Sequence, residues 1–227
     1  IGEFIKKRLL EIAAQVPIRA DPDPKCTANL FVIVSAKTPE YAAKVQAFQA
    51  GCQRGEIEDG PAANCVPNGM PSIMTQPYPI EILFTPGKVT ILIEAYAQWR
   101  QIFTDGREHP EDPDLTFNGH SIGHWEGDTL VVDTVGFTTD TFLGNQGMRH
   151  SEKMQIVERF RLAQPDRLEV QTTITDAEAL TKPITRTAAY GRHRDWTLAE
   201  YVCQQNNRNF TTDDGKAGID LSFEEEK

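Results

Sequence analysis

The chain has 227 residues, of which 39% are hydrophobic and 25% charged, with a formal net charge of −10. These values suit one sizeable globular domain, or one domain with an appended segment. The acidic balance disfavours nucleic acid and anionic membrane surfaces as partners, because phosphate binding needs clustered Lys and Arg. No apolar run reaches the roughly 18–20 residues of a membrane-spanning helix.

The first third of the chain predicts helices and irregular segments. In residues 4–16 apolar side chains recur at helical spacing, and a short β-branched strand is expected at residues 29–36. A second helix is expected to begin at Thr38 as N-cap and to end near Gly51. We therefore assign residues 1–60 to an N-terminal helical or mixed segment.

From residue 80 onward the pattern changes to β. Segments rich in β-branched and aromatic residues follow one another, connected by turn signals with Gly, Pro or Asp. Because short turns join antiparallel neighbours, we expect a mainly β fold with N-terminal helices. Its antiparallel meander should form an up-and-down barrel or a strongly curled sheet, in a domain of residues 61–227 with a polar C-terminal tail. The expected strands are residues 80–84, 88–103, 128–137, 153–162, 166–176, 183–191 and 195–203.

Four charged residues fall on apolar or mixed faces of these expected strands: Glu94, Glu158, Arg186 and Glu200. A charge on an apolar face costs several kcal/mol unless it is paired or hydrated. One interpretation is structural, with Arg186 paired to Glu158 or Glu200 inside the sheet. The other is a barrel interior that binds a ligand, in which a buried carboxylate would have a raised pKa and could act as an acid or base.

The stretch "GHSIGHWEGD", residues 119–128, contains two histidines four positions apart. On a helix, His120 and His124 could share one metal ion, but the flanking glycines and the following apolar run favour an extended chain. The two rings would then lie about 13 Å apart. We therefore predict a hairpin entry with a buried Trp125 and no metal. We expect His120 to face the polar interior and His124 to lie near solvent.

His150 precedes Glu152 by two positions, in "HSE". In an extended segment the two side chains would lie on one side, and the carboxylate would orient the imidazole. A turn or N-cap is the alternative interpretation of these residues. The chain has no GxSxG elbow, P-loop, GxGxxG or HExxH motif, which disfavours nucleotide and zinc-protease chemistry. No cofactor is expected.

The four cysteines, Cys26, Cys52, Cys65 and Cys203, form no CxxC pair, so a structural zinc site is not expected. Four cysteines permit three disulfide pairings. A bond between the loop at Cys65 and the end of the expected strand at Cys203 is one sensible pairing. Four buried thiols in a cytosolic protein are the alternative.

Three segments carry a resemblance to a known family: "FTDGREHPEDPDLTFNGHSIGHWEGDTLVVDTVGF", "HSEKMQIVERFR" and "DWTLAEYVCQQNN". They resemble a family of uncharacterised, β-rich bacterial proteins of sphingomonads and other proteobacteria that are generally expected to be exported. The resemblance covers about residues 65–207, whereas residues 1–36 resemble another class of exported proteins. It implies a periplasmic or secreted location and favours a disulfide between Cys65 and Cys203, and it implies no residue's role in catalysis.

These observations leave three classes of function open. The first is acid–base chemistry, as a lyase, isomerase or hydrolase, on an apolar or aromatic small molecule. The second is a non-catalytic module that binds such a ligand, and the third is a structural or assembly component that contacts another envelope protein. The expected site residues are Glu94, Glu158 and Glu200 as acid or base, His120 and His150 as assisting groups, Tyr96 and Trp125 as pocket wall, and Arg186 as a ligand-binding residue.

Overall fold

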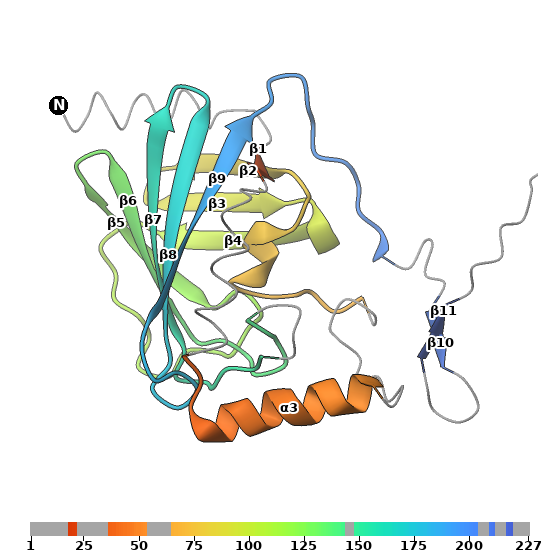
Figure 1. Ribbon diagram of the computed structural model, residues 1–227. Helices are drawn as coiled ribbons and strands as arrows, with labels where there is room; N and C mark the ends of the chain where they lie inside the picture. Colours follow the sequence, from red (N-terminus) through yellow and green to blue (C-terminus); the bar gives the residue numbers. More distant parts are fainter. Residues whose placement is uncertain are drawn as a thin grey trace, which may run out of the picture.

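The computed structural model describes residues 18–21, 36–53, 65–143, 148–203, 209–211 and 217–219 (Figure 1). The helix expected at residues 4–16 and most of the strand expected at 29–36 lie outside these ranges. Within them, no helix is long and apolar enough to cross a membrane.

Eight consecutive strands form one strongly curled sheet, which confirms the expected mainly β fold (Figure 1). All neighbours in the series are antiparallel except β4 and β5, which are parallel and joined by the long loop of residues 104–119. The strands are β2 (Ile80–Thr85), β3 (Lys88–Ile93), β4 (Gln98–Phe103), β5 (His120–Glu126), β6 (Thr129–Val135), β7 (Gln155–Gln164), β8 (Arg167–Thr175) and β9 (Ile184–Arg192).

A further short strand, β1 (Ile18–Asp21), closes the sheet into a barrel. It pairs with β9 over its whole length but with β2 only between Ile18 and Ile80, so this is the weakest seam. Two other short strands, β10 (Asn209–Thr211) and β11 (Ala217–Ile219), pair only with each other.

The prediction of a single strand at residues 88–103 is wrong. The chain turns through the 3-10 helix η3 (Ala95–Ala97), with φ of 59° at Tyr96 and 48° at Ala97, so that β3 and β4 pair as a hairpin. Positive φ is uncommon for residues other than glycine, and the sequence carries no turn residue here. The break changes which face each later side chain occupies: Trp99 is 60% exposed, whereas Arg100 is buried.

The strand expected at residues 195–203 is also not formed. The segment is irregular and lies against η3, where the backbone amide of Ala199 donates to Oε2 of Glu94 at 2.7 Å. The ring of Tyr201 packs between those of Tyr78 and Tyr96, with centroids 5.4 and 5.1 Å away. The alternating apolar residues of this segment therefore do not form a strand, and the segment is held against the barrel by the contacts of Ala199 and Tyr201.

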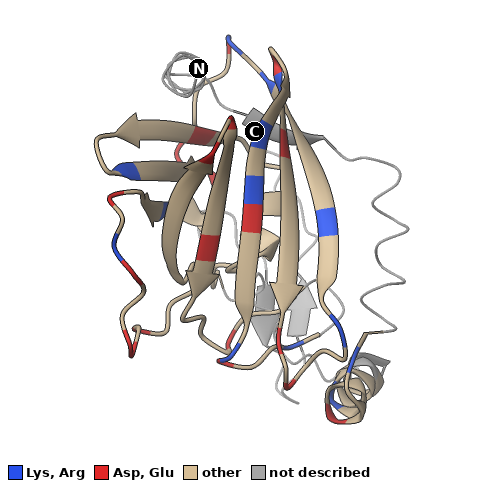
Figure 2. Ribbon diagram, turned by 90° about the vertical axis from the view of Figure 1, so that its left-hand side faces the viewer, with Lys and Arg blue, Asp and Glu red and all other residues tan. Residues whose placement is uncertain are grey.

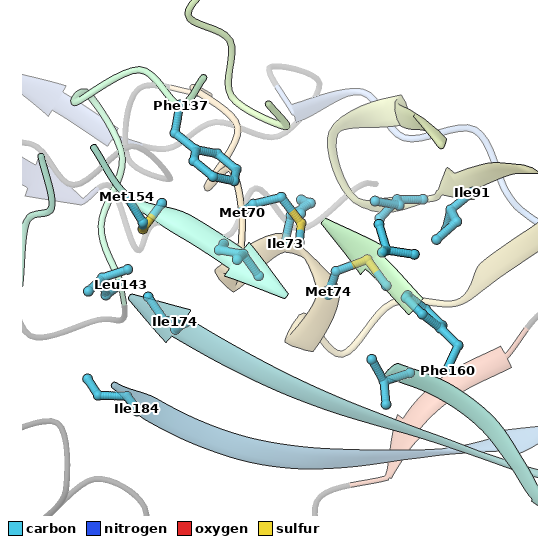
Figure 3. Packing of buried hydrophobic residues seen from close by; sticks show 14 of the residues in the cluster. Met70, Ile73, Met74, Ile91, Phe137, Leu143, Met154, Phe160, Ile174 and Ile184 are labelled. Atoms are coloured by element: carbon cyan, nitrogen blue, oxygen red, sulfur yellow. The ribbon is translucent and has the colours of Figure 1, made fainter. Parts of the chain in front are cut away.

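The barrel interior is filled largely by the chain itself. Residues 65–75 run into it and end in the 3-10 helix η2 (Ser72–Thr75). Met70, which precedes this helix, and Ile73 and Met74 within it are buried among the inward side chains of the sheet (Figure 3). The Tyr190 hydroxyl donates to the Met74 carbonyl at 2.7 Å. This part of the interior is thus a packed core.

The helix expected after Thr38 is confirmed as α3 (Pro39–Gln53), which lies across one end of the barrel (Figure 1). It packs Tyr41 and Val45 into the core. The Thr38 hydroxyl donates to the Glu178 carbonyl at 2.8 Å. The Thr38 side chain therefore ties the start of the helix to the loop after β8.

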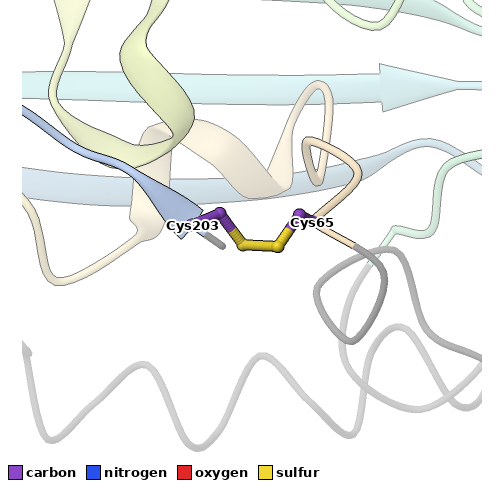
Figure 4. The surroundings of a disulfide bond; sticks show 2 residues. All are labelled: Cys65 and Cys203. Atoms are coloured by element: carbon purple, nitrogen blue, oxygen red, sulfur yellow. A yellow bond between two sulfur atoms is a disulfide. The ribbon is translucent and has the colours of Figure 1, made fainter. Parts of the chain in front are cut away.

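The disulfide between Cys65 and Cys203 is present, with the two Cα atoms 5.6 Å apart (Figure 4). It joins positions 138 residues apart in the sequence. The bond fastens the segment that enters the barrel to the segment of residues 193–203 outside it.

The strand directions define two ends of the barrel. The turn end carries the hairpin turns of β2–β3, β5–β6 and β7–β8. Gly127, with φ of 61°, and Asp128 form the β5–β6 turn, which confirms the hairpin expected there. The loop end carries α3, η3 and the longer connections at residues 136–154 and 176–183.

Candidate functional site

A buried ion pair lies in the barrel interior between Arg100 of β4 and Glu158 of β7. Each side chain is 1% exposed, and Nη2 of Arg100 lies 2.5 Å from Oε2 of Glu158. Arg100 also donates from Nε to Oγ of Ser121 at 3.1 Å and from Nη2 to Oγ1 of Thr134 at 2.8 Å. The two hydroxyls lie 2.9 Å apart. Three neighbouring strands thus orient one guanidinium toward one carboxylate.

The pair is compensated in charge but incomplete in hydrogen bonds. Among the described residues, neither Nη1 of Arg100 nor either carboxylate oxygen of Glu158 has a hydrogen-bond partner. The close contact between the two side chains is therefore an ion contact without hydrogen-bond geometry. Buried charged groups usually satisfy their hydrogen bonds, so this pair is unusual in having three buried polar atoms without a hydrogen-bond partner.

Arg186 is also placed in this region, but Glu158 has its ion pair with Arg100. Glu158, Thr172 and Arg186 are register partners on β7, β8 and β9. Nη2 of Arg186 donates to the Pro71 carbonyl at 2.9 Å, which anchors the segment that fills the barrel. Arg100 is absent from the site residues that the sequence predicts, because the strand break at η3 reverses its face.

A pocket of about 270 Å³ opens at the turn end of the barrel. None of its lining residues is charged. The Trp125 side chain is half-buried, and its ring lies 6.3 Å from that of Phe84 with an interplanar angle of 30°. Trp125 packs against the end of the core, as expected, although it remains partly exposed. The lining residues are Phe84, Thr85, Pro86, Gly87, Val89, Thr104 and Trp125.

The pocket and the ion pair are separated by a packed layer. The inward side chains of β4 are Arg100 and Ile102, and Ile102 is fully buried between Arg100 and the pocket residue Thr104. On β5, Ser121 is the register partner of Ile102, and a Cβ at Gly123, two residues further along, would lie 2.8 Å from Cγ2 of Ile102. A strand rises about 3.3 Å per residue, so Arg100 lies roughly 13 Å along β4 from Thr104.

His120 faces outward, which corrects the expectation that it faces the interior. Ser121, its neighbour on β5, takes the inward position. Nδ1 of His120 lies 2.9 Å from Nδ1 of His109, and its ring stacks on Phe103 with centroids 5.5 Å apart. Burial, then His109 and an arginine nearby, lower the pKa of His120. His124 shares this outward face and is 67% exposed, which confirms its expected place near solvent.

His150 is buried at the loop end and acts as a hydrogen-bonding node. With Nδ1 protonated, it donates to the Ser151 carbonyl at 2.9 Å and accepts from the Thr141 hydroxyl at Nε2, at 2.7 Å. Burial lowers the pKa of His150. Glu152 is exposed in a turn, so the turn interpretation is confirmed and the pairing of Glu152 with His150 is wrong.

A second loop-end node is Asp176, which the sequence did not single out. It accepts from the backbone amide of Ser151 at 2.7 Å and from its hydroxyl at 2.8 Å. It also accepts from the amides of Glu178 and Ala179, both at 3.0 Å. An aspartate followed by a turn is a common local signal, but its partner 25 residues away is not.

The remaining expected residues do not join the ion pair. Glu94 and Tyr96 lie beside the outer segment of residues 193–203, and Glu200 on that segment is exposed. Burial, with Tyr96 and Tyr78 nearby, raises the pKa of Tyr201 to about 12. The cluster of Tyr78, Tyr96 and Tyr201 holds a peripheral segment against the barrel. It does not line a site around the buried carboxylate of Glu158.

Acidic and basic residues are interleaved along the strands that Figure 2 shows. In the described ranges, no group of three or more His, Cys, Asp or Glu side chains is arranged to hold a metal ion. Comparison with protein-family models, curated proteins and solved structures gives no match to this chain.

Proposed function

We propose that the protein is an exported β-barrel module that binds a small, flat, uncharged aromatic molecule in the turn-end pocket without transforming it. The observation that carries this proposal is the near-parallel arrangement of Phe84 and Trp125 in a pocket without charged side chains. Aromatic walls give a large apolar contact area and prefer stacked geometries.

The spacing of the two rings suits a sandwiched ligand after a small opening. Carbon atoms in contact lie about 3.5–4.0 Å apart, so a flat molecule between two rings needs about 7–8 Å. The rings of Phe84 and Trp125 are 6.3 Å apart and differ in plane by 30°. Trp125 is only partly buried and lies near a hairpin turn, so a modest rotation of its side chain would admit the ligand.

The size and chemistry of the pocket restrict the ligand. A volume of about 270 Å³ lies just below the usual 300–1,000 Å³ of small-molecule sites, which favours one or two fused rings. The Thr85 hydroxyl, which donates to the Lys88 carbonyl at 3.1 Å, can accept a hydrogen bond from a polar substituent, and the Thr104 hydroxyl offers a second polar contact. A charged ligand would lose hydration without a compensating partner.

Binding is favoured over acid–base chemistry because the buried carboxylate lies away from this space. Glu158 is paired with Arg100, and Ile102 fills the level between that pair and the pocket. The lining residues include no carboxylate or imidazole. A group that transfers a proton must reach the reacting atom within hydrogen-bond distance, directly or through one water.

Export is supported by the disulfide between Cys65 and Cys203. Disulfides form and persist in oxidising compartments such as the periplasm or the extracellular space. The resemblance of residues 65–207 to an exported bacterial family points the same way, toward a periplasmic or secreted protein.

Fluorescence titration tests the proposal directly. In a Trp99→Phe/Trp196→Phe background, Trp125 is the remaining tryptophan, and 1-naphthol should quench its emission to saturation. Cyclohexanol, which has the hydroxyl but no aromatic face, and 2-naphthoate, which is charged, should bind at least about tenfold more weakly, a difference of about 1.4 kcal/mol.

Calorimetric titration with 1-naphthol then locates the site in the otherwise unmodified chain. Trp125→Leu and Phe84→Leu should each weaken binding by about tenfold or more, while Trp99→Phe, which alters an exposed ring elsewhere, should leave it unchanged. Saturable binding that survives Trp125→Leu, or no binding of 1-naphthol at all, would refute the proposal.

A further inference from the structure

The loop between β4 and β5 brings a histidine onto the outer face of the sheet. His109 comes from the proline-bounded part of this loop, and His120 is the first residue of β5. Their Nδ1 atoms lie 2.9 Å apart, with an angle of 69° between the ring planes. Both rings are partly buried, so this arrangement differs from that of two mobile surface histidines.

The second ring nitrogen of His109, Nε2, lies near a carboxylate. Nε2 is buried without a hydrogen-bond partner among the described residues, and Oδ2 of Asp133 lies 3.8 Å from it. Gln155 donates to both carboxylate oxygens of Asp133 at 2.9 Å, which fixes the carboxylate. A histidine that binds a metal through one nitrogen usually presents its other N–H to such a carboxylate.

We propose that His109 and His120 bind one divalent late transition-metal ion through their Nδ1 atoms, with Asp133 as the outer carboxylate. Metal–imidazole bonds are about 2.0–2.1 Å long. Two nitrogens at adjacent positions of a tetragonal ion then lie about 2.9 Å apart, and at tetrahedral positions about 3.4 Å apart. Each ring needs only to rotate about its Cβ–Cγ bond, a soft torsion for histidine.

In the metal-free protein the two Nδ1 atoms are joined by an N–H···N hydrogen bond of 2.9 Å, and this separation is already close to the tetragonal spacing that Cu²⁺ accommodates. The general order of affinity of nitrogen ligands for divalent ions also places Cu²⁺ above Zn²⁺. Because no third protein ligand completes the pair within the described ranges, water or another small ligand takes the other positions. The ion is therefore exchangeable.

The loop that carries His109 is acidic in sequence. The sequence of residues 104–119 holds five acidic residues and one basic residue, Arg107, whose guanidinium is paired to Asp105 at 2.6 Å. This inference does not depend on the pocket proposed above.

The test uses the metal-stripped full chain titrated with CuCl₂ and, separately, ZnCl₂. Electron paramagnetic resonance should show one equivalent of Cu²⁺ with nitrogen ligands, bound at least about tenfold more tightly than Zn²⁺ in calorimetry. His109→Ala and His120→Ala should each weaken Cu²⁺ binding at least about tenfold. Asp133→Asn should weaken it less, and the matched control His124→Ala, on the same face of β5, should leave it unchanged.

Circular dichroism checks that each variant is folded. Independently of the variants, imidazole NMR of the unmodified protein with Zn²⁺ should shift the signals of His109 and His120 and leave those of His150 and His193 in place. Unchanged Cu²⁺ affinity in His109→Ala and His120→Ala, equal loss in His124→Ala, or no binding would overturn the proposal.

Discussion

The two ends of the barrel are built by different means. At the loop end, Asp176 and His150 hold the connections through buried hydrogen bonds, and the disulfide ties the segment inside the barrel to the one outside. At the turn end, Phe84 and Trp125 border a neutral pocket. The closed end thus carries His150, a residue that the sequence pattern associates with function, whereas no residue that lines the pocket at the other end titrates.

This difference separates chemical reactivity from access. Glu158 has the composition of a catalytic carboxylate, but it lies between the two ends in an ion pair 1% exposed. A charged side chain on an apolar strand face is equally compatible with a structural pair and with a binding site. The presence or absence of a cavity next to that side chain decides between the two, and the alternation of side chains along a strand does not reveal a cavity.

The largest expected effect comes from breaking the pair that lies between the ends. Glu158→Ala should lower the free energy of unfolding by about 3–5 kcal/mol, because it leaves the Arg100 charge buried without a partner. Chemical denaturation monitored by circular dichroism measures this. The double variant Arg100→Met/Glu158→Leu should recover most of the loss, since a well-packed apolar pair often replaces a buried ion pair at little cost.

If Glu158→Ala is as stable as the unmodified protein, the pair is hydrated, and the interior is more open than the packed layer at Ile102 indicates. Such a result would erase the contrast between the sealed interior and the open turn end. It would also return Glu158 to the candidates for acid–base chemistry.

The next effect sharpens the contrast by loosening only the loop end. Cys65→Ser/Cys203→Ser should lower the free energy of unfolding by about 2–4 kcal/mol, mainly because the unfolded chain gains freedom when the long loop is opened. Binding of 1-naphthol at the turn end should persist at temperatures where the variant is folded. Parallel loss of affinity and stability would show that the two ends are coupled.

The turn end was the more predictable from the sequence. Gly127 and Asp128 predict a tight turn. Because side chains alternate in an extended chain, the sequence also predicts correctly that His120 and His124 lie on one face of β5. The prediction that His120 on this face points into the barrel was wrong. Alternation alone does not say which side of a strand is buried when polar and apolar residues are mixed.

The loop end and the interior were less predictable for physical reasons. The break at η3 puts Tyr96 and Ala97 in a left-handed conformation without glycine, so local preference gives no sign of it. One unrecognised turn then reverses the faces of Trp99 and Arg100. The approach of His109 to His120 depends on the path of a long loop, which no local pattern specifies.

The smallest expected effect is a dependence on pH at the loop end. Burial depresses the pKa of His150 in the folded protein, whereas the unfolded chain has the ordinary value of about 6.5. Between these two values the unfolded state binds more protons, so stability falls as the pH falls below about 6.5 and is fully present above it. The slope from one histidine cannot exceed about 1.4 kcal/mol per pH unit.

His150→Asn isolates this contribution, because asparagine keeps a side-chain N–H for the Ser151 carbonyl but does not titrate. Melting temperatures measured from pH 8 to pH 5 should fall less steeply in His150→Asn than in the unmodified protein, even if the variant is less stable at pH 8. His120, whose pKa is also depressed, contributes to both curves and cancels in the comparison. Identical slopes would mean that His150 becomes protonated without leaving its place, and that the loop end is less tightly sealed than its hydrogen bonds to Thr141 and Ser151 indicate.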